Sequence, residues 1–271
     1  MQSFPAHSDL KNSGLLVVGH GSREAVGLRE FLETARLMKS LAGPTPVEPC
    51  FLEFAEPSIA EGFRRLVAQG VRQVIVSPVL LFAAGHAKRD IPDAVAAAAA
   101  QAPGVTTRQA EHLGSEPRLL ALSQQRYQES VACDAGAPHD VDQSLLVLVG
   151  RGSLDPEATA EMHAFARQRQ QMVHRGGTSP AVEVAFVAMA EPRLSDVLER
   201  AAAAAPRRIV VQPHLLFGGV LLDRIADTVR EFAGRFPQHE WLTAAHLGPH
   251  PLVAEALLAR AAETMLTHHQ R

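Results

Sequence analysis

The chain has 271 residues, of which 46% are hydrophobic and 20% are charged, and its formal net charge is −3. This length predicts about two domains, and so weak a net charge gives no sign of a protein that binds nucleic acid or an anionic membrane. The first dozen residues do not resemble a signal peptide, and no apolar run is long enough to span a membrane. We therefore expect a cytoplasmic protein.

Apolar runs alternate with longer amphipathic segments along the first half of the chain. The expected strands are 14–19, 47–53, 73–78 and 104–111, and the expected helices are 23–41, 57–69, 89–101 and 116–131. Continuous β-branched runs are typical of strands that are buried on both faces. Strands that alternate with helices predict an α/β fold with a parallel sheet and right-handed crossovers.

The second half repeats the first in the same order. "LLVVGHGSRE" at 15–24 returns as "LVLVGRGSLD" at 146–155, and "FLEFAEPSI" at 51–59 returns as "FVAMAEPRL" at 186–194. A duplicated domain explains this pattern. We place the boundary in the polar stretch 133–144, which gives domains 1–135 and 136–271. Each domain is expected to hold a four-stranded parallel sheet flanked by helices.

Three polar residues of the first half are missing from the second. His20 is replaced by Arg151, Glu53 by Ala188 and His86 by Leu221. The three fall at the carboxyl ends of the expected strands or in the loops beyond them, where sheets of this kind bind ligands. Two imidazoles and one carboxylate suit a divalent transition metal, and three protein ligands leave a coordination position open.

Each of these residues also has a structural interpretation. His20 could be a turn residue, with Ser22 capping the next helix, and Gly21 with Ser22 could cradle a phosphate. Glu53 could pair with an arginine, and His86 could be a solvated loop residue.

Three further histidines are interpreted as structural. His112 and His246 stand in an "HLG" motif that both halves keep, which favours a structural role. His214 aligns with Val79 of the first half. We interpret it as a surface or core residue rather than one that points into a cleft.

Taken together, "VVGHGSR", "FLEFAEPSI" and "VSPVLLFAAGHAKRDI" resemble the CbiX-type sirohydrochlorin chelatases of the class II chelatase superfamily, in their fused two-domain form. The resemblance runs from about residue 14 to 262 and implies two α/β domains with a cleft between them. It implies insertion of Co²⁺ or Fe²⁺ into sirohydrochlorin, for cobalamin or sirohaem, with Ni²⁺ a further candidate and no organic cofactor. The resemblance also implies that His20 and His86 are the metal ligands, that Glu53 lies beside them, and that all three are catalytic residues. It implies no metal site in the second half.

Sirohydrochlorin carries eight carboxylates, so a site for it needs cations, of which arginine pairs best with a carboxylate. The candidates are Arg23, Lys88 and Arg89 near the metal motifs, and Arg151 and Arg224 at matching places in the second half. Our hypothesis is that Arg151 took the place of a metal ligand and became a clamp for a substrate carboxylate. The alternative is a solvated turn residue.

Two other classes of function remain open. A metal or tetrapyrrole carrier would keep His20 and His86 without turnover, and a phosphate-ester enzyme would use Gly21 and Ser22 to hold an anion. We expect sirohydrochlorin as the partner, with no nucleic acid or membrane. We also expect a monomer or weak homo-oligomer, because the fused halves can supply a pseudo-dimer.

Overall fold

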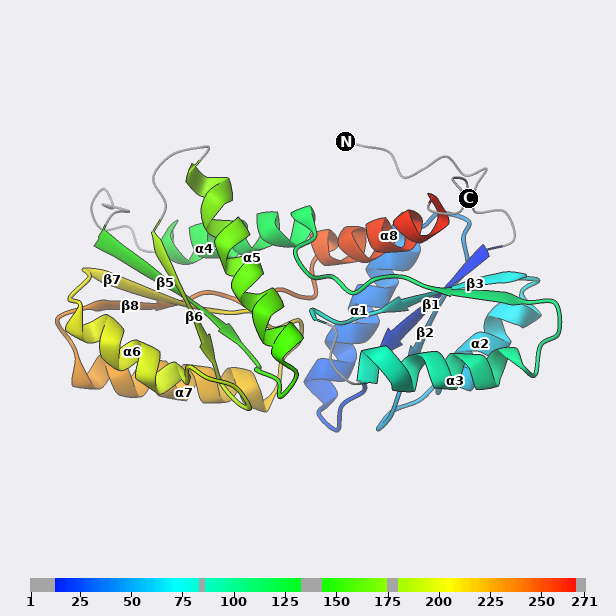
Figure 1. Ribbon diagram of the computed structural model, residues 1–271, viewed down its shortest axis with the longest axis horizontal. Coiled ribbons are helices and arrows are strands. Elements are labelled where there is room, and N and C mark those ends of the chain that lie inside the picture. Colours follow the sequence, from blue (N-terminus) through cyan, green and yellow to red (C-terminus); the bar gives the residue numbers. More distant parts are fainter. Residues whose placement is uncertain (1–12, 83–85, 133–142, 175–179, 267–271) are drawn as a thin grey trace. The chain divides into compact units, whose positions relative to one another are not determined.

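The computed structural model describes residues 13–82, 86–132, 143–174 and 180–266, and its chain divides into two compact units. Unit 1 comprises residues 1–113 and 249–271, and unit 2 comprises residues 114–248 (Figure 1). No helix among the described residues is both long and apolar enough to cross a membrane.

Unit 1 is built on a parallel sheet of four strands in the order β2-β1-β3-β4. Its strands are β1 (Ser13–Gly19), β2 (Val47–Phe51), β3 (Gln73–Pro78) and β4 (Thr106–Gln109). Its helices are α1 (Ala25–Leu41), α2 (Ile59–Ala68), the short π-helix η1 (His86–Asp90), α3 (Ile91–Ala99) and α8 (Pro251–Leu266). In the register of the sheet, Gly19 at the end of β1 lies opposite Phe51 at the end of β2.

Unit 2 repeats this architecture with the strand order β6-β5-β7-β8, again all parallel. Its strands are β5 (Ser144–Gly150), β6 (Ala181–Phe186), β7 (Arg208–Pro213) and β8 (Glu240–Thr243). Its helices are α4 (Pro117–Ala132), α5 (Pro156–His174), α6 (Leu194–Ala203) and α7 (Val220–Arg235). The predicted fold of two α/β halves with four-stranded parallel sheets is confirmed.

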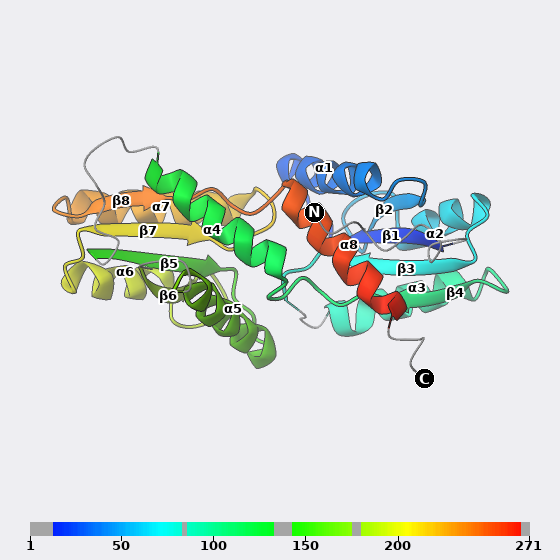
Figure 2. The same ribbon diagram turned by 90° about the horizontal axis from the view of Figure 1, so that it is seen from above.

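The central strands β1 and β5 are buried along their whole length. Leu16 and Val18 of β1 pack in one cluster with Phe63 of α2 and Val95 of α3. Neighbouring side chains of a strand point to opposite faces, so the equally buried Leu15 and Val17 face the other side of the sheet. Helices cover both faces of each sheet (Figure 2), which explains why these strands are apolar throughout instead of alternating.

The two last helices of the repeats are exchanged between the units. α4 follows β4 of unit 1 along the chain but packs on α5, β7 and β8 in unit 2. α8 follows β8 of unit 2 but packs on α1, β3 and β4 in unit 1. The repeats of the sequence, 1–135 and 136–271, therefore do not coincide with the units of packing.

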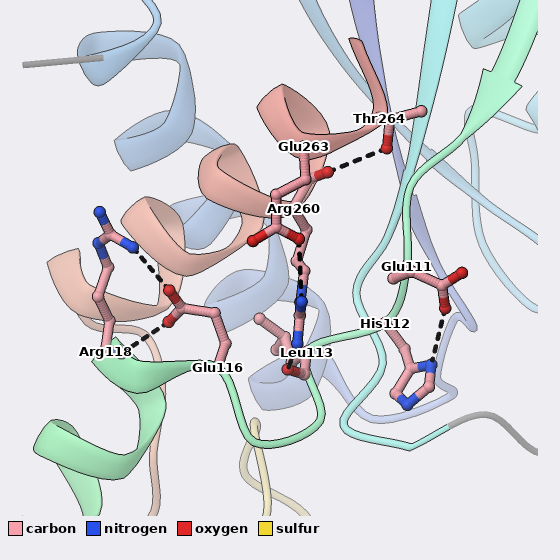
Figure 3. A network of polar contacts seen from close by, with 8 residues as sticks. All are labelled: Glu111, His112, Leu113, Glu116, Arg118, Arg260, Glu263 and Thr264. Atoms are coloured by element: carbon pink, nitrogen blue, oxygen red, sulfur yellow. Dashed lines mark hydrogen bonds and ion pairs between the residues drawn. The ribbon is translucent and has the colours of Figure 1, made fainter. Parts of the chain in front are cut away.

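Hydrogen bonds from arginines secure each exchanged helix in its unit. In unit 1, Arg260 of α8 donates from Nη2 to the carbonyl of Leu113 at 3.0 Å (Figure 3). In unit 2, Arg126 of α4 donates from Nε to the carbonyl of His246 at 3.0 Å. Leu113 and His246 belong to the two "HLG" motifs, which therefore serve as anchor points for these helices.

Candidate functional site

The loop after β1 is bound to the loop after β2 through the main chain. The amide of Leu52 donates to the carbonyl of Gly19 at 2.9 Å, and the amide of Glu53 donates to the carbonyl of His20 at 3.1 Å. Gly21 has a φ of 95°, and a Cβ there would lie 1.7 Å from the carbonyl oxygen of Glu53. Glycine is required at this position because the two backbones approach so closely.

This backbone arrangement brings His20 and Glu53 face to face. Nε2 of His20 lies 3.2 Å from Oε1 of Glu53, and their side chains are 36% and 40% exposed. The predicted strand 47–53 is too long, because β2 ends at Phe51 and Glu53 lies in the loop beyond it. An imidazole nitrogen and a carboxylate oxygen that are adjacent and open to solvent are suitable donors for a divalent transition ion.

The thiol on the neighbouring strand is not available as a ligand. Cys50 of β2 is fully buried, and burial, aided by the charge of Glu48, raises the pKa of its thiol to about 12. A thiol binds metals as the thiolate. The donors that this edge offers near neutral pH are therefore nitrogen and oxygen.

The structure leaves the third expected ligand undetermined. His86 begins η1, directly ahead of α3, and its side chain lies outside the described part of the molecule. The side chains that are described contain no group of three or more His, Cys, Asp or Glu residues able to hold a metal ion. Of the predicted trio, then, the structure brings His20 and Glu53 together.

The expected substrate cations lie on exposed positions of both units. In unit 1, the guanidinium of Arg23 lies over the ring of Phe54 at 4.9 Å, and Lys88 and Arg89 extend from η1. In unit 2, Arg151 follows β5 and Arg224 is in α7. All five are exposed.

Unit 2 keeps the backbone arrangement but not the imidazole and the carboxylate. The amide of Val187 donates to Gly150, and the amide of Ala188 donates to Arg151 at 2.9 Å. Gly152 has a φ of 87°, and a Cβ there would lie 1.9 Å from the carbonyl oxygen of Ala188. The loops are the same, whereas a guanidinium and a methyl group replace the imidazole and the carboxylate.

The structure places Ser22 in a turn ahead of α1 and His214 in the core of unit 2. Ser22 does not cap α1: its hydroxyl accepts a hydrogen bond from the amide of Glu24 at 3.0 Å, and Glu24 is the residue that precedes the helix. His214 belongs to the core, where its ring lies 4.2 Å from the ring of Phe165. Complete burial lowers its pKa to about 3, so it is neutral in the folded protein.

Sequence reasoning missed Phe54, which follows Glu53 with a φ of 63° and remains half-exposed. Its ring lies edge-on to the ring of His20, with centroids 6.1 Å apart. The sequence did hold a signal, because Met189 is a large apolar residue at the matching position of the second repeat. In the structure both residues lie three positions beyond the end of a strand and share a left-handed backbone, with a φ of 58° at Met189.

Comparison with known proteins finds the same family in both halves of the chain. The CbiX family model matches residues 14–130 and again 145–264. A sirohydrochlorin cobaltochelatase of Priestia megaterium is 30% identical over 92% of this chain and 79% of its own length. A sirohydrochlorin ferrochelatase of Bacillus subtilis is 32% identical over 92% of this chain and 91% of its own. The solved structure of SirB from Bacillus subtilis with Fe³⁺ superposes with a TM-score of 0.83 at 28% identity, covering 96% of this chain and 98% of that one.

Proposed function

Because the chain belongs to the CbiX family, we propose that it is a metallochelatase that inserts Co²⁺ or Fe²⁺ into sirohydrochlorin. The observation that carries this proposal is the pair of His20 and Glu53, whose donor atoms lie 3.2 Å apart at the carboxyl edge of the unit 1 sheet. The relatives named above, one for cobalt and one for iron, support both metals as substrates.

The chemistry of the pair fits such a reaction. A neutral imidazole can hold the incoming metal, or can accept one of the two pyrrole protons that leave the macrocycle, because one of its ring nitrogens carries a free lone pair. The Glu53 carboxylate adds charge to the metal site and can accept a proton in turn. Because both side chains are partly exposed, the metal and the released protons can reach the pair from solvent.

We propose His86 as the second imidazole ligand. Its position on η1 follows the end of β3, the strand next to β1, at the same edge of the sheet. Two nitrogens and one oxygen would hold the metal with an open coordination position, through which it can pass to the macrocycle. No thiolate is needed, in keeping with the buried thiol of Cys50.

Alanine substitutions test the assignment. Purified protein is mixed with sirohydrochlorin and Co²⁺, Fe²⁺ or Ni²⁺ in turn, and metallation is followed by absorbance. We expect His20→Ala, Glu53→Ala and His86→Ala each to slow metallation by about a hundredfold or more. His163→Ala is the matched control, because His163 of unit 2 makes a similar edge contact with Phe186, at 6.1 Å. Full activity in all three site variants would refute the assignment.

The same assay separates the enzyme from a carrier. A carrier binds Co²⁺ or sirohydrochlorin through the same residues but gives no rate above the spontaneous reaction. A wild-type rate equal to that of the protein-free mixture would therefore favour the carrier.

We propose that the exposed cations bind the carboxylates of the substrate. Arg151→Ala is expected to raise the KM for sirohydrochlorin by about tenfold, and Arg151→Lys by less, because lysine keeps the charge but loses the two-bond fork. The same measurement of KM after substitution by alanine tests the other four cations, which are Arg23, Lys88, Arg89 and Arg224. An unchanged KM in Arg151→Ala would identify it as a solvated turn residue. The cytoplasmic location and the oligomeric state stay predictions.

A further inference from the structure

Phe54 is a large aromatic side chain that the fold leaves 52% exposed beside the His20–Glu53 pair. Its φ of 63° lies in the left-handed region, which residues with a side chain rarely adopt. That conformation costs free energy, and a half-exposed ring gains little from burial to offset the cost. Packing inside unit 1 therefore gives little reason for a phenylalanine at this position.

The contacts of Phe54 join it to two residues of the site. The guanidinium of Arg23 lies 4.9 Å from the centre of its ring, which is the geometry of a cation–π contact. The ring of His20 lies edge-on to it, with an interplanar angle of 87°. An apolar surface, a cation and the histidine of the candidate metal site are thus adjacent on one loop cluster of unit 1.

The second repeat separates this feature from metal binding. Met189 has a φ of 58° and is 44% exposed, although the neighbouring position is Ala188 and not a carboxylate. A large apolar side chain in the left-handed conformation is therefore kept where the ligands are lost. Its purpose is accordingly something other than holding the metal.

We propose that Phe54 is a substrate-binding residue, on which the apolar face of the tetrapyrrole rests beside His20, while the same ring holds Arg23 in place for a peripheral carboxylate. This inference rests on the proposed function, since it takes the tetrapyrrole as the ligand. An exposed ring suits a flat conjugated macrocycle, because stacking removes apolar surface of both partners from water. A guanidinium already ordered against that ring loses less freedom when it pairs with a carboxylate.

The first experiment measures metallation and binding separately. We expect Phe54→Ala to raise the KM for sirohydrochlorin and its Kd without metal by about tenfold, and Phe54→Leu to fall between it and the wild type. Affinity for Co²⁺ alone should stay within about twofold of the wild type, because no metal donor is removed. Leu32→Ala is the control, since Leu32 of α1 is an apolar side chain of unit 1 that is 44% exposed, and it should leave every constant unchanged.

A double-mutant cycle tests the link to Arg23. If the ring holds the guanidinium in place, Phe54→Ala and Arg23→Ala each weaken sirohydrochlorin binding, and the double variant weakens it by less than the product of the two. Independent, multiplicative effects would overturn the positioning of Arg23 by Phe54.

Thermal unfolding distinguishes binding from a structural role. Phe54→Gly relieves the left-handed conformation, so we expect its Tm to equal or exceed that of the wild type while sirohydrochlorin binding is weakened. A lower Tm with unchanged binding would overturn the proposal, as would an active Phe54→Ala variant with wild-type KM and Kd. A wild-type protein that neither binds nor metallates sirohydrochlorin would refute the proposed function itself.

Discussion

The loops that follow β1 and β5 have the same backbone and different chemistry. In each, an amide two residues beyond the second strand donates to the carbonyl of the first loop residue, and a glycine with positive φ permits the close approach. Unit 1 places His20 and Glu53 on this backbone, and unit 2 places Arg151 and Ala188. The comparison shows that the loop geometry belongs to the fold, whereas the donor atoms that the loop presents depend on its side chains.

Exchanging the two side chains is the most direct way to break this comparison. We expect His20→Arg to lower kcat/KM for Co²⁺ insertion by about a thousandfold, because a guanidinium has no lone pair to offer a metal or a proton. Arg151→His should change kcat/KM by about tenfold or less, because unit 2 still lacks the carboxylate. The rate is followed by absorbance. An equal loss of kcat/KM in the two variants would contradict the different roles of positions 20 and 151.

The shared backbone predicts equal effects in the two units. Gly21→Ala and Gly152→Ala should each lower the free energy of unfolding by about 3 kcal/mol, because the added Cβ meets a carbonyl oxygen in a positive-φ loop. Gly70→Ala is the control: Gly70 has a φ of 86° but nothing within 4 Å of the added Cβ, so its cost should be about 1 kcal/mol. Urea denaturation measures all three, and a tolerated Gly152→Ala would show that the loops differ.

His214 and Val79 occupy matching positions, and only the histidine is sensitive to acid. Burial lowers the pKa of His214 from 6.5 to about 3, so between these values the unfolded chain binds a proton that the folded chain does not. Stability is therefore lost as the pH falls through this window, by about 2 kcal/mol between pH 7 and pH 5.

The variant His214→Val, which copies the first repeat, should lack this part of the pH dependence. Urea denaturation of wild type and variant at both pH values gives the difference, from which the other titrating groups cancel. A difference that does not change with pH would contradict the depressed pKa.

Gln212 and Ser77 occupy matching positions of the two repeats. Their substitutions have the smallest expected effects on stability. Gln212 of β7 donates from Nε2 to the carbonyl and the hydroxyl of Ser123 on α4, at 3.0 and 3.1 Å. The hydroxyl of Ser77 is buried and has no hydrogen-bond partner among the described residues. Gln212→Ala should cost about 1.5 kcal/mol of stability, and Ser77→Ala should be neutral within about 0.5 kcal/mol. Equal costs would mean that this contact does not help to hold α4.

Much of the fold follows from local patterns in the sequence. The predicted strands overlap all four strands of the unit 1 sheet, and strand 73–78 agrees with β3 at both ends. The expected helix 23–41 begins early, because α1 starts at Ala25 after a turn closed by Ser22. Strand 104–111 is also longer than β4, whose side chains are mostly exposed at the edge of the sheet. The ends of helices and strands depend on individual hydrogen bonds, which the hydrophobic pattern of the sequence does not show.

The candidate site was predictable in part. Comparison of the repeats singled out His20 and Glu53, and the structure places their donor atoms together, although 33 positions separate them in the sequence. The left-handed conformation of Phe54 was not predictable, because phenylalanine has no intrinsic preference for it. It arises where the main chain turns from β2 towards α2, and that path is set by tertiary contacts.

By itself, the sequence determined the duplication, the order of strands and helices, and the replacement of His20, Glu53 and His86 in the second copy. The tertiary structure alone decided which helix covers which sheet, so that α4 packs in unit 2 and α8 in unit 1. The physical reason is that the amphipathic pattern of a helix shows which of its faces is buried. It does not show which sheet that face packs against. The two sheets are near copies, so the partner of each helix is seen only in long-range contacts, of which Arg260 with Leu113 and Gln212 with Ser123 are two.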